Sequence, residues 1–286
     1  MEERATFGLG WVPELPDIRD YLQGSASVGP LLAKTGARRA LGKGARKGGP
    51  GSVDLRRWCS PIENQGSLGS CTAHAAVGLV EYFERRAFAK HIDASRLFVY
   101  KVTRDLLHWT GDQGAYLRTA MKALVLFGAP PEEYWPYRVS EFDKEPPSFC
   151  YALASNYKAV QYFRLDPNGG TPAQALASVK SFLAAGYPSM FGFTVYSSIW
   201  DAAGGKIPYP TASDRVDGGH AVVAIGYDDA MTVGRHKGAL LIRNSWGPGW
   251  GVNGYGWLPY AYVADGLADD FWSVVSQSWV DTGNFA

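Results

Sequence analysis

The sequence predicts an α+β protein with two lobes, because helical patterns and β-forming runs occupy different parts of the chain. Helical periodicity prevails from Cys71 to about residue 185, and short β-forming runs bounded by Gly, Asp and Pro follow it. With 286 residues the chain can bury a sizeable core, in one large domain or in two lobes. No internal repeat interrupts this order.

The near-neutral charge argues against partners that would bind through the overall charge of the protein. The chain has 28 basic and 27 acidic residues, a formal net charge of +1, which gives no electrostatic reason to expect a nucleic-acid or membrane partner. No run of about 18 apolar residues could span a membrane, and the start lacks the apolar region of a secretory signal. We therefore expect a cytoplasmic location, with secretion by another route left open.

Residues 1–22 are predicted to form an N-terminal arm. The stretch "GWVPELPDIRDYL" is punctuated by proline and partly apolar, so it should be extended and should pack on the rest of the protein. Residues 23–52 are rich in Gly, Ala, Lys and Arg, which is typical of a flexible basic linker. A helical lobe over 53–155 and a β-rich lobe over 156–286 complete the expected organisation.

Four segments are predicted to be helices. An amphipathic pattern follows Cys71, and Ser95 is a candidate N-cap for the next helix. "AYLRTAMKALVLFGAPP" stops at Gly128 before two prolines, and "TPAQALASVKSFLAAG" opens at Thr171 and closes at Gly186. The predicted strands are "PSMFGFTVY", "HAVVAIGY", "GALLIRN", "YGWLPYAYV" and "FWSVVSQSWV".

Cys71 is either a reactive thiol at a helix start or an ordinary buried cysteine. A thiol attacks as the thiolate, so a nucleophilic cysteine needs its pKa lowered by a helix N-terminus or an adjacent imidazolium. A helix that begins at Cys71 supplies the first of these. Three cysteines do not make a disulfide framework, although a bridge between Cys59 and Cys150 is left open if Cys71 stays free.

Only one of the five histidines fits the partner that such a thiol needs. His91, His108 and His236 lie in polar surroundings and are predicted at the surface. His74 follows Cys71 by three residues, but without a further Cys or His cluster a structural histidine is favoured over a zinc ligand. In "DGGHAVVAIGYDD", His220 begins a β-run after two glycines that leave space beside it, so it can face a cleft.

A third motif follows His220 by 24 residues. In "IRNSWGPGWGVNGYGWLPY" the amide of Asn244 ends a strand and could hydrogen-bond the far nitrogen of the His220 ring, which would fix the ring's orientation. Trp246 could then shield that bond from water. Taken alone, "NSWG" is better explained as a turn with a packed indole.

The motifs "NQGSLGSC", "GGHAVVAIGYD" and "IRNSWGPGWGVNGYG" together resemble those of the papain-like cysteine peptidases in order and spacing, over about 53 to 263. The resemblance implies a papain-like two-lobe fold, with a helical left lobe, an antiparallel β-barrel-like right lobe and the active-site cleft between them. It implies Cys71 as the nucleophile, His220 as its imidazolium partner and base, and Asn244 as the orienting residue. Gln65 and the backbone N–H of Cys71 would form the oxyanion hole.

The resemblance also points to substrate-binding positions. "GDQGAYLR" matches the glycine-rich rim of the family's cleft and indicates Gln113, Gly114 and Tyr116, while Gly219 beside the base and the shielding Trp246 complete the set. The sequence departs from the family at two positions that leave the catalytic groups intact. The family has a cysteine where this chain has Leu68 and an aromatic residue where it has Thr72.

These departures are typical of a divergent bacterial branch of the family. The family's long helical prosegment is replaced by the short arm and the basic linker, an arrangement that resembles the xylellain-like enzymes of plant-associated bacteria. The arm suggests one further hypothesis, in which residues 11 to 21 lie across or beside the cleft and restrain activity as an intramolecular inhibitor. The alternative is an arm that packs on the back of a lobe for stability.

The expected function is hydrolysis of peptide bonds in peptide or protein substrates, through a thioester acyl-enzyme. Two other readings remain open at this point. The same Cys, His and Asn set could carry out acyl transfer or deamidation, and a catalytically silent papain-like protein could bind a partner. No cofactor or metal is implied by the sequence.

Overall fold

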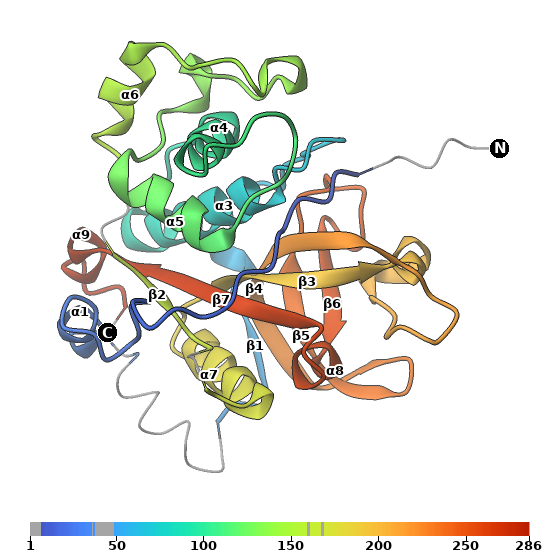
Figure 1. The fold of residues 1–286 in the computed structure, drawn as a ribbon. Helices are drawn as coiled ribbons and strands as arrows, with labels where there is room; N and C mark the ends of the chain where they lie inside the picture. Colours follow the sequence, from blue (N-terminus) through green and yellow to red (C-terminus); the bar gives the residue numbers. More distant parts are fainter. Residues whose placement is uncertain (1–6, 36, 38–48, 159–160, 167–168, 286) are drawn as a thin grey trace.

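The protein folds into a group of helices and an antiparallel sheet, with the N-terminal arm running along the junction between them (Figure 1). The structure is a computed structural model that describes residues 7–35, 37, 49–158, 161–166 and 169–285. The helices are α1 (Gly29–Ala33), α3 (Cys71–Phe88), α4 (Arg96–Leu106), α5 (Leu117–Leu126), α6 (Ser148–Ala154), α7 (Pro172–Ala184), α8 (Tyr260–Ala264) and α9 (Gln277–Val280). Short 3-10 turns are η1 (Arg56–Trp58), η2 (Glu132–Tyr134), η3 (Val139–Glu141), η4 (Ser197–Asp201) and η5 (Ala203–Gly205).

One antiparallel sheet forms the second lobe. Its strands are β1 (Ser52–Asp54), β2 (Gln161–Arg164), β3 (Ser189–Tyr196), β4 (Val216–Val233), β5 (His236–Arg243), β6 (Tyr255–Pro259) and β7 (Ala268–Val275). They pair in the order β2-β7-β3-β4-β5-β6, and β1 pairs with β4. The two outer strands of this path are not paired with each other in the described part of the chain, so the sheet does not close. The α+β class and the two-lobe architecture are confirmed.

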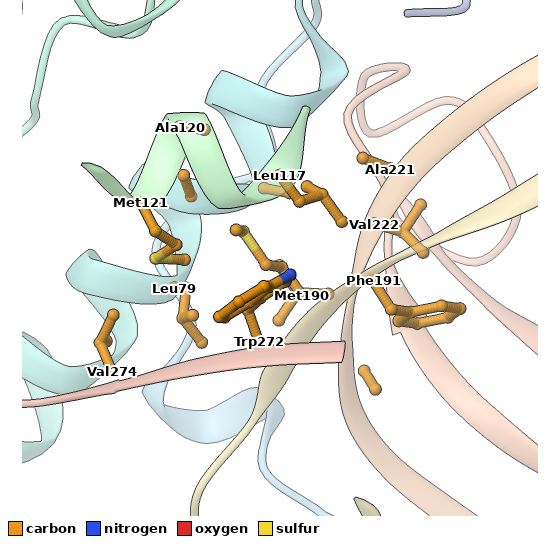
Figure 2. Packing of buried hydrophobic residues seen from close by; sticks show 14 of the residues in the cluster. Leu79, Leu117, Ala120, Met121, Met190, Phe191, Ala221, Val222, Trp272 and Val274 are labelled. Carbon is orange, nitrogen blue, oxygen red and sulfur yellow. The ribbon is translucent and has the colours of Figure 1, made fainter. Parts of the chain in front are cut away.

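The long helix α3 lies at the centre, between the other helices and the sheet. Its side chains are buried almost all round, which is typical of a helix inside a core rather than on a surface. Figure 2 shows Leu79 of α3, Met121 of α5 and Met190 and Trp272 of the sheet meeting in one cluster. These contacts hold the start of α3 in a single position against the sheet.

A glycine allows α3 to approach the sheet closely. A Cβ on Gly78 would lie 2.3 Å from Nη1 of Arg243 on β5, so a larger residue could not occupy this position without a shift. The Arg243 guanidinium is 5% exposed and donates to the carbonyl oxygens of Ser60 and Pro61. The helix-propensity cost of a glycine, about 1 kcal/mol, is therefore offset by close packing of the helix on the sheet.

The helix starts that were predicted from N-capping residues are confirmed. The Ser95 hydroxyl accepts a hydrogen bond from the Phe98 N–H at 3.1 Å and caps α4. Thr171 and Gln174 form a reciprocal capping box at the start of α7. α5 ends as predicted before Gly128, whose φ of 79° lies in the left-handed region that favours glycine.

The arm is extended, as its prolines predict, and it packs along the junction of the two lobes. Trp11 forms a parallel bridge with Ala115 next to α5, and its N–H donates to the carbonyl of Gly219 on β4 at 3.0 Å. Farther along, both oxygens of the 6% exposed Asp20 carboxylate accept hydrogen bonds from the Arg118 guanidinium. In Figure 1 the arm is the dark blue segment between the helices and the sheet.

The linker prediction for residues 23–52 is wrong over its first part. Residues 29–33 form α1, and the side chains of Val28 and Leu32 are 0% and 2% exposed within the core. The apolar residues of this stretch are buried against the body, and that burial offsets the entropy lost on ordering them. Residues 36 and 38–48, which carry most of the basic side chains of the predicted linker, lie outside the described residues.

Two predicted strands end early. The run from Tyr255 leaves the sheet after Pro259 and continues as α8, and the run from Phe271 continues as α9 after Val275. The second change lets Trp279 stack on Phe83 of α3, with ring centroids 5.2 Å apart. Tertiary packing therefore overrides the β propensity of these aromatic segments.

Cys59 and Cys150 are free thiols, so the bridge left open by the sequence does not form. Within the described ranges the helices are too short or too polar to cross a membrane. The same part of the chain brings no three His, Cys, Asp or Glu side chains together in an arrangement suited to a metal ion.

A buried ion pair joins α3 to α4. Glu81 is 0% exposed and Arg96 is 2% exposed, and the guanidinium donates to both carboxylate oxygens at 3.0 and 3.1 Å. The Ser60 hydroxyl also donates to Glu81, at 2.5 Å. Removing one partner of such a pair leaves the other charge buried and uncompensated.

We expect Arg96→Met to lower the free energy of unfolding by about 3–5 kcal/mol, because Glu81 loses its buried counter-charge. Adding Glu81→Leu should recover part of this loss, because the two residues interact directly. Urea denaturation measures both values. The control is Arg138→Met, whose guanidinium is 64% exposed and 3.9 Å from Glu141, and which should change stability by less than about 0.5 kcal/mol. Equal effects of the two arginine substitutions would contradict the stabilising role of the buried Glu81–Arg96 ion pair.

Candidate active site

Cys71 is the first residue of α3, and its side chain is completely buried where the helix meets β4. The helix N-terminus places positive backbone dipoles at the sulfur, which favours the thiolate. Backbone hydrogen bonds from Ala221 and Gly10 act in the same direction, yet burial dominates and raises the pKa of Cys71 to about 11. Ala221 follows His220 directly, so the packing of α3 brings the thiol to the strand position predicted for its partner.

His220 lies on β4 and is held by one ring nitrogen. Nε2 lies 2.7 Å from Oδ1 of Asn244, the hydrogen bond that the sequence predicts. The same Oδ1 accepts the backbone N–H of Ser245 at 2.8 Å, which identifies it as the oxygen of the amide. Nε2 therefore carries the proton, and Nδ1 is left as the acceptor. Among the described residues, this buried Nδ1 has no hydrogen-bond partner.

Trp246 covers the His220–Asn244 hydrogen bond, as predicted. Its ring stacks on the imidazole with centroids 4.4 Å apart and planes inclined by 23°. His220 and Asn244 are consequently 0% and 2% exposed. Excluding water in this way strengthens the hydrogen bond and keeps the ring in one orientation.

Gln65 is oriented by a residue that the sequence analysis did not single out. The Ser245 hydroxyl donates to Oε1 of Gln65 at 2.6 Å, and the backbone N–H of Gln65 donates to the Ser245 carbonyl at 2.9 Å. Nε2 of Gln65 then points the other way and donates to the carbonyl oxygens of Leu68 at 2.8 Å and Gly8 at 2.9 Å. The position of Ser245 inside the "NSWG" motif was the available signal.

Gly8 belongs to the arm, so the donor predicted for an oxyanion hole is already engaged by a main-chain carbonyl. The Gly8 N–H donates to the Gly66 carbonyl at 2.9 Å, and the ring of Phe7 stacks on Trp246 at 5.1 Å. A Cβ on Gly8 would lie 2.1 Å from the carbonyl oxygen of Leu68, so only glycine fits here without displacement. The arm thus reaches the site with Phe7 and Gly8, which precede the residues 11 to 21 that the sequence hypothesis placed at the cleft.

The arm continues past Cys71 along the rim predicted to bind substrate. Ala115 N–H donates to the Gly10 carbonyl at 2.8 Å, and Val12 N–H donates to the Ala115 carbonyl at 3.2 Å. Gly114, with a φ of 73°, allows this approach, because a Cβ there would lie 2.2 Å from the Gly10 oxygen. Gly114 and Gly219 therefore both lie against the arm.

Gln113 and Tyr116 lie differently from the other predicted rim residues. The exposed Gln113 side chain donates to the Thr110 carbonyl, and the half-buried Tyr116 ring packs on Trp109 at 5.2 Å. Within the described ranges neither side chain hydrogen-bonds to the arm, and their contact with substrate stays a prediction. His74 is a structural histidine as predicted, 2% exposed with Nδ1 3.1 Å from the Ser70 carbonyl.

The protonation of the pair differs from the expected thiolate and imidazolium. Burial lowers the pKa of His220 to about 4, although the hydrogen bond to Asn244 opposes this shift, and burial raises the pKa of Cys71. Both groups are consequently neutral near pH 7 while the arm covers them. The sequence pattern could not reveal this, because it contains no information on how much water reaches the pair.

Comparisons with known proteins agree with this arrangement. The family model for papain family cysteine proteases matches residues 49–268. A peptidase C1-like protein of Acanthamoeba polyphaga mimivirus is 35% identical over 229 residues, covering 78% of this chain and 71% of its own. A cathepsin B-like protein of Giardia intestinalis is 32% identical, covering 72% and 68%.

A solved structure carries the likeness over nearly the whole chain. Xylellain, a cysteine protease from Xylella fastidiosa, superimposes with a TM-score of 0.74 and is 32% identical, covering 96% of this chain and 98% of its own. The fold, the matched family model and these relatives lead to one conclusion. The chain belongs to the papain family of cysteine proteases.

Proposed function

We propose that this protein hydrolyses peptide bonds through a thioester acyl-enzyme on Cys71, and that its N-terminal arm keeps the active site closed until the arm withdraws. One observation carries the proposal. Gln65 Nε2 donates to the main-chain carbonyl of Gly8 at 2.9 Å, and a substrate carbonyl would need the same donor. The arm therefore uses the groups that a substrate would use, and the two must compete.

The hydrogen bonds support a role for each group of the site. Because Nε2 of His220 is committed to Asn244, Nδ1 can accept the thiol proton of Cys71, and the resulting imidazolium remains hydrogen-bonded through Nε2. The thiolate then attacks the scissile carbonyl, and the oxyanion that forms accepts a hydrogen bond from Gln65.

The same imidazolium completes both half-reactions. It protonates the leaving amine when the C–N bond breaks, which leaves a thioester on Cys71. His220 then removes a proton from a water molecule that attacks the thioester, and it returns the proton to the departing thiolate. The products are a carboxylic acid and an amine, and the enzyme is restored. Asn244 acts in both steps by holding one tautomer and one ring orientation.

The protonation state explains why the arm can remain bound without being cleaved. Burial holds Cys71 as a thiol and His220 as a neutral imidazole while the arm is in place. Withdrawal of the arm admits water, which removes the desolvation that opposes the ion pair. Activation is therefore a change of solvation at the pair together with the opening of the oxyanion hole.

We expect Gly10→Ala in the full-length chain to raise kcat/KM for a small fluorogenic peptide by about 5- to 150-fold. A Cβ at this position would lie 1.8 Å from the Gly69 carbonyl oxygen, and overpacking of this kind costs about 1–3 kcal/mol of arm docking. Gly24→Ala, just beyond the arm, is the matched control, because a Cβ there meets nothing within 4 Å. Cys71→Ala in the Gly10→Ala chain measures the background. An unchanged rate with a demonstrably displaced arm would refute autoinhibition.

The pH dependence of Cys71 alkylation by iodoacetamide should also separate the two chains. Thiolate, the reactive form, accumulates only above the thiol pKa, so alkylation of the wild-type chain should be slow at pH 6 and rise toward pH 11. In the Gly10→Ala chain the released pair should ionise at lower pH, and alkylation at pH 6 should be rapid. Mass spectrometry of the Cys71 peptide gives both rates. Identical pH profiles would count against the proposal.

Ser245→Ala, introduced into the Gly10→Ala chain, should lower kcat more than it changes KM, because Gln65 loses the hydroxyl that orients its amide. The loss should be smaller than the about 100- to 1,000-fold expected for Gln65→Ala, which removes the donor itself. Adding Ser245→Ala to Gln65→Ala should then change little, because the hydroxyl acts through Gln65. Full additivity of the two substitutions would show that Ser245 acts in another way.

A further inference from the structure

The arm also fills a side-chain pocket beside the catalytic pair. Trp11 is 6% exposed, and its ring rests on two glycines of neighbouring strands. A Cβ on Gly192 would lie 1.9 Å from Cε2 of the ring, and a Cβ on Gly219 would lie 2.9 Å from Cε3. Neither glycine has a φ in the left-handed region. Glycine is therefore needed at these positions because a Cβ would occupy the space of the ring, and not because of the backbone conformation. We call this space the Trp11 pocket.

The pocket has a buried carboxylate at one end. Asp270 is 0% exposed, and its Oδ2 accepts a hydrogen bond from the Trp11 indole Nε1 at 3.3 Å. Asp270 lies at a β-bulge, because β7 has an extra residue between the partners of Met190 and Gly192, and its φ is 62°. The bulge turns this carboxylate toward the arm instead of leaving it in the alternation of the strand.

The two oxygens of Asp270 have different environments. Oδ1 accepts the Trp272 indole N–H at 2.7 Å and lies 3.2 Å from Nη1 of Arg164. Among the described residues, Trp11 is the one hydrogen-bond donor to Oδ2. Withdrawal of the arm therefore leaves a buried acceptor aimed into an empty pocket, and an acceptor of this kind penalises any occupant that brings no donor.

The charges around the pocket favour a neutral donor over a cation. Arg164 pairs directly with Asp166 at 3.0 Å and with Asp270 at 3.2 Å, and its guanidinium carbon lies 5.2 Å from the Trp272 ring. The carboxylate at the end of the pocket therefore keeps a counter-charge after Asp20 and Glu14 leave with the arm. A substrate cation would enter a site whose negative charge is already compensated.

We propose that the Trp11 pocket selects tryptophan side chains in substrates, through an indole N–H donated to Oδ2 of Asp270. The proposal rests on the proposed function, and it names the substrate class of the same active site. Backbone contacts place the pocket next to the reacting groups, because Trp11 N–H bonds the carbonyl of Gly219 beside His220. Asp270 is then a specificity-determining residue, and Gly192 and Gly219 supply the room for a bicyclic ring.

The substrate test uses the full-length Gly10→Ala chain at pH 8, because burial raises the pKa of Asp270 to about 7 and the carboxylate must be ionised to accept. Quenched peptides of one sequence carry Trp one, two or three residues to either side of the cleaved bond, and the best register is kept. At that position Trp is compared with Phe, Arg and benzothienylalanine, which has the shape of Trp without the N–H.

We expect kcat/KM for Trp to exceed that for benzothienylalanine by about 10- to 150-fold, the range for a hydrogen bond to a charged group. Equal rates, or a preference for Phe or Arg, would overturn the proposal.

Two further substitutions in the Gly10→Ala chain test whether the Trp preference arises in the Trp11 pocket. Asp270→Asn tolerates the positive φ and keeps an oxygen for Trp272, so its Nδ2 replaces Oδ2 and cannot accept. The ratio between Trp and benzothienylalanine should fall to about 1. Gly192→Ala should remove the preference for large rings, because its Cβ occupies the space of the indole. A Trp preference that survives both substitutions would place the recognition elsewhere.

A binding measurement keeps this inference separate from the proposed function. The full-length Trp11→Gly chain should have a cavity shaped for an indole, and free indole should raise its melting temperature more than benzothiophene does, with no shift for either compound in wild type. Equal shifts would contradict the role of Oδ2. If no peptide is cleaved but indole is preferred, the peptidase assignment fails and the pocket assignment holds. If peptides are cleaved without a Trp preference, the pocket assignment fails and the peptidase assignment holds.

Discussion

The site depends on the close packing of the start of α3 against β4. This contact brings Cys71 to His220, 149 positions further along the chain, because the Cys71 sulfur lies against the backbone of Ala221, the neighbour of His220. Gly78 makes the contact possible by admitting the Arg243 guanidinium under the helix. The buried ion pair between Glu81 and Arg96 fixes the other side of the helix. A small rotation of α3 would separate the thiol from its base, and the packed core resists such a rotation.

Three consecutive residues on the sheet side organise everything around that contact. Asn244 orients the imidazole, Ser245 orients the Gln65 amide, and Trp246 covers the His220–Asn244 hydrogen bond. Because the same backbone carries all three, a shift of this segment would disturb the base and the oxyanion donor together. Catalytic groups held in this way need no rearrangement when charge develops during the reaction.

The arm stabilises the closed state by satisfying polar groups that an empty cleft would leave unpaired. Gly8 accepts from Gln65, the Trp11 indole donates to Asp270, and Asp20 pairs with Arg118. These groups are buried, so leaving them without partners is costly. Under the proposed function, a substrate that replaces the arm would have to supply the same kinds of partner. Gly10 of the arm also lies against Cys71, and in the proposed autoinhibition its withdrawal would change the solvation of Cys71 and His220 as well as access to them.

The sequence by itself determined the fold class, the helix starts with clear caps and the residues Cys71, His220, Asn244 and Gln65 as a candidate set. These features depend on local chemistry: periodicity, capping side chains and short motifs whose residues lie next to one another in the chain. The roles of Gln113 and Tyr116 in binding substrate stay predictions. The short helix α1 in the expected linker and the helical ends of two expected strands required the packing of distant apolar side chains, which local propensity does not contain.

Only the tertiary structure decided what the arm touches and how the catalytic pair is protonated. The contact of Gly8 with Gln65 spans 57 residues and that of Trp11 with Asp270 spans 259, and neither contact has a local sequence signal. The pKa values of Cys71 and His220 depend on burial, which is a property of the assembled fold. A motif names the groups that can react, whereas the three-dimensional packing determines which of them meet, how much water surrounds them and which charges they carry.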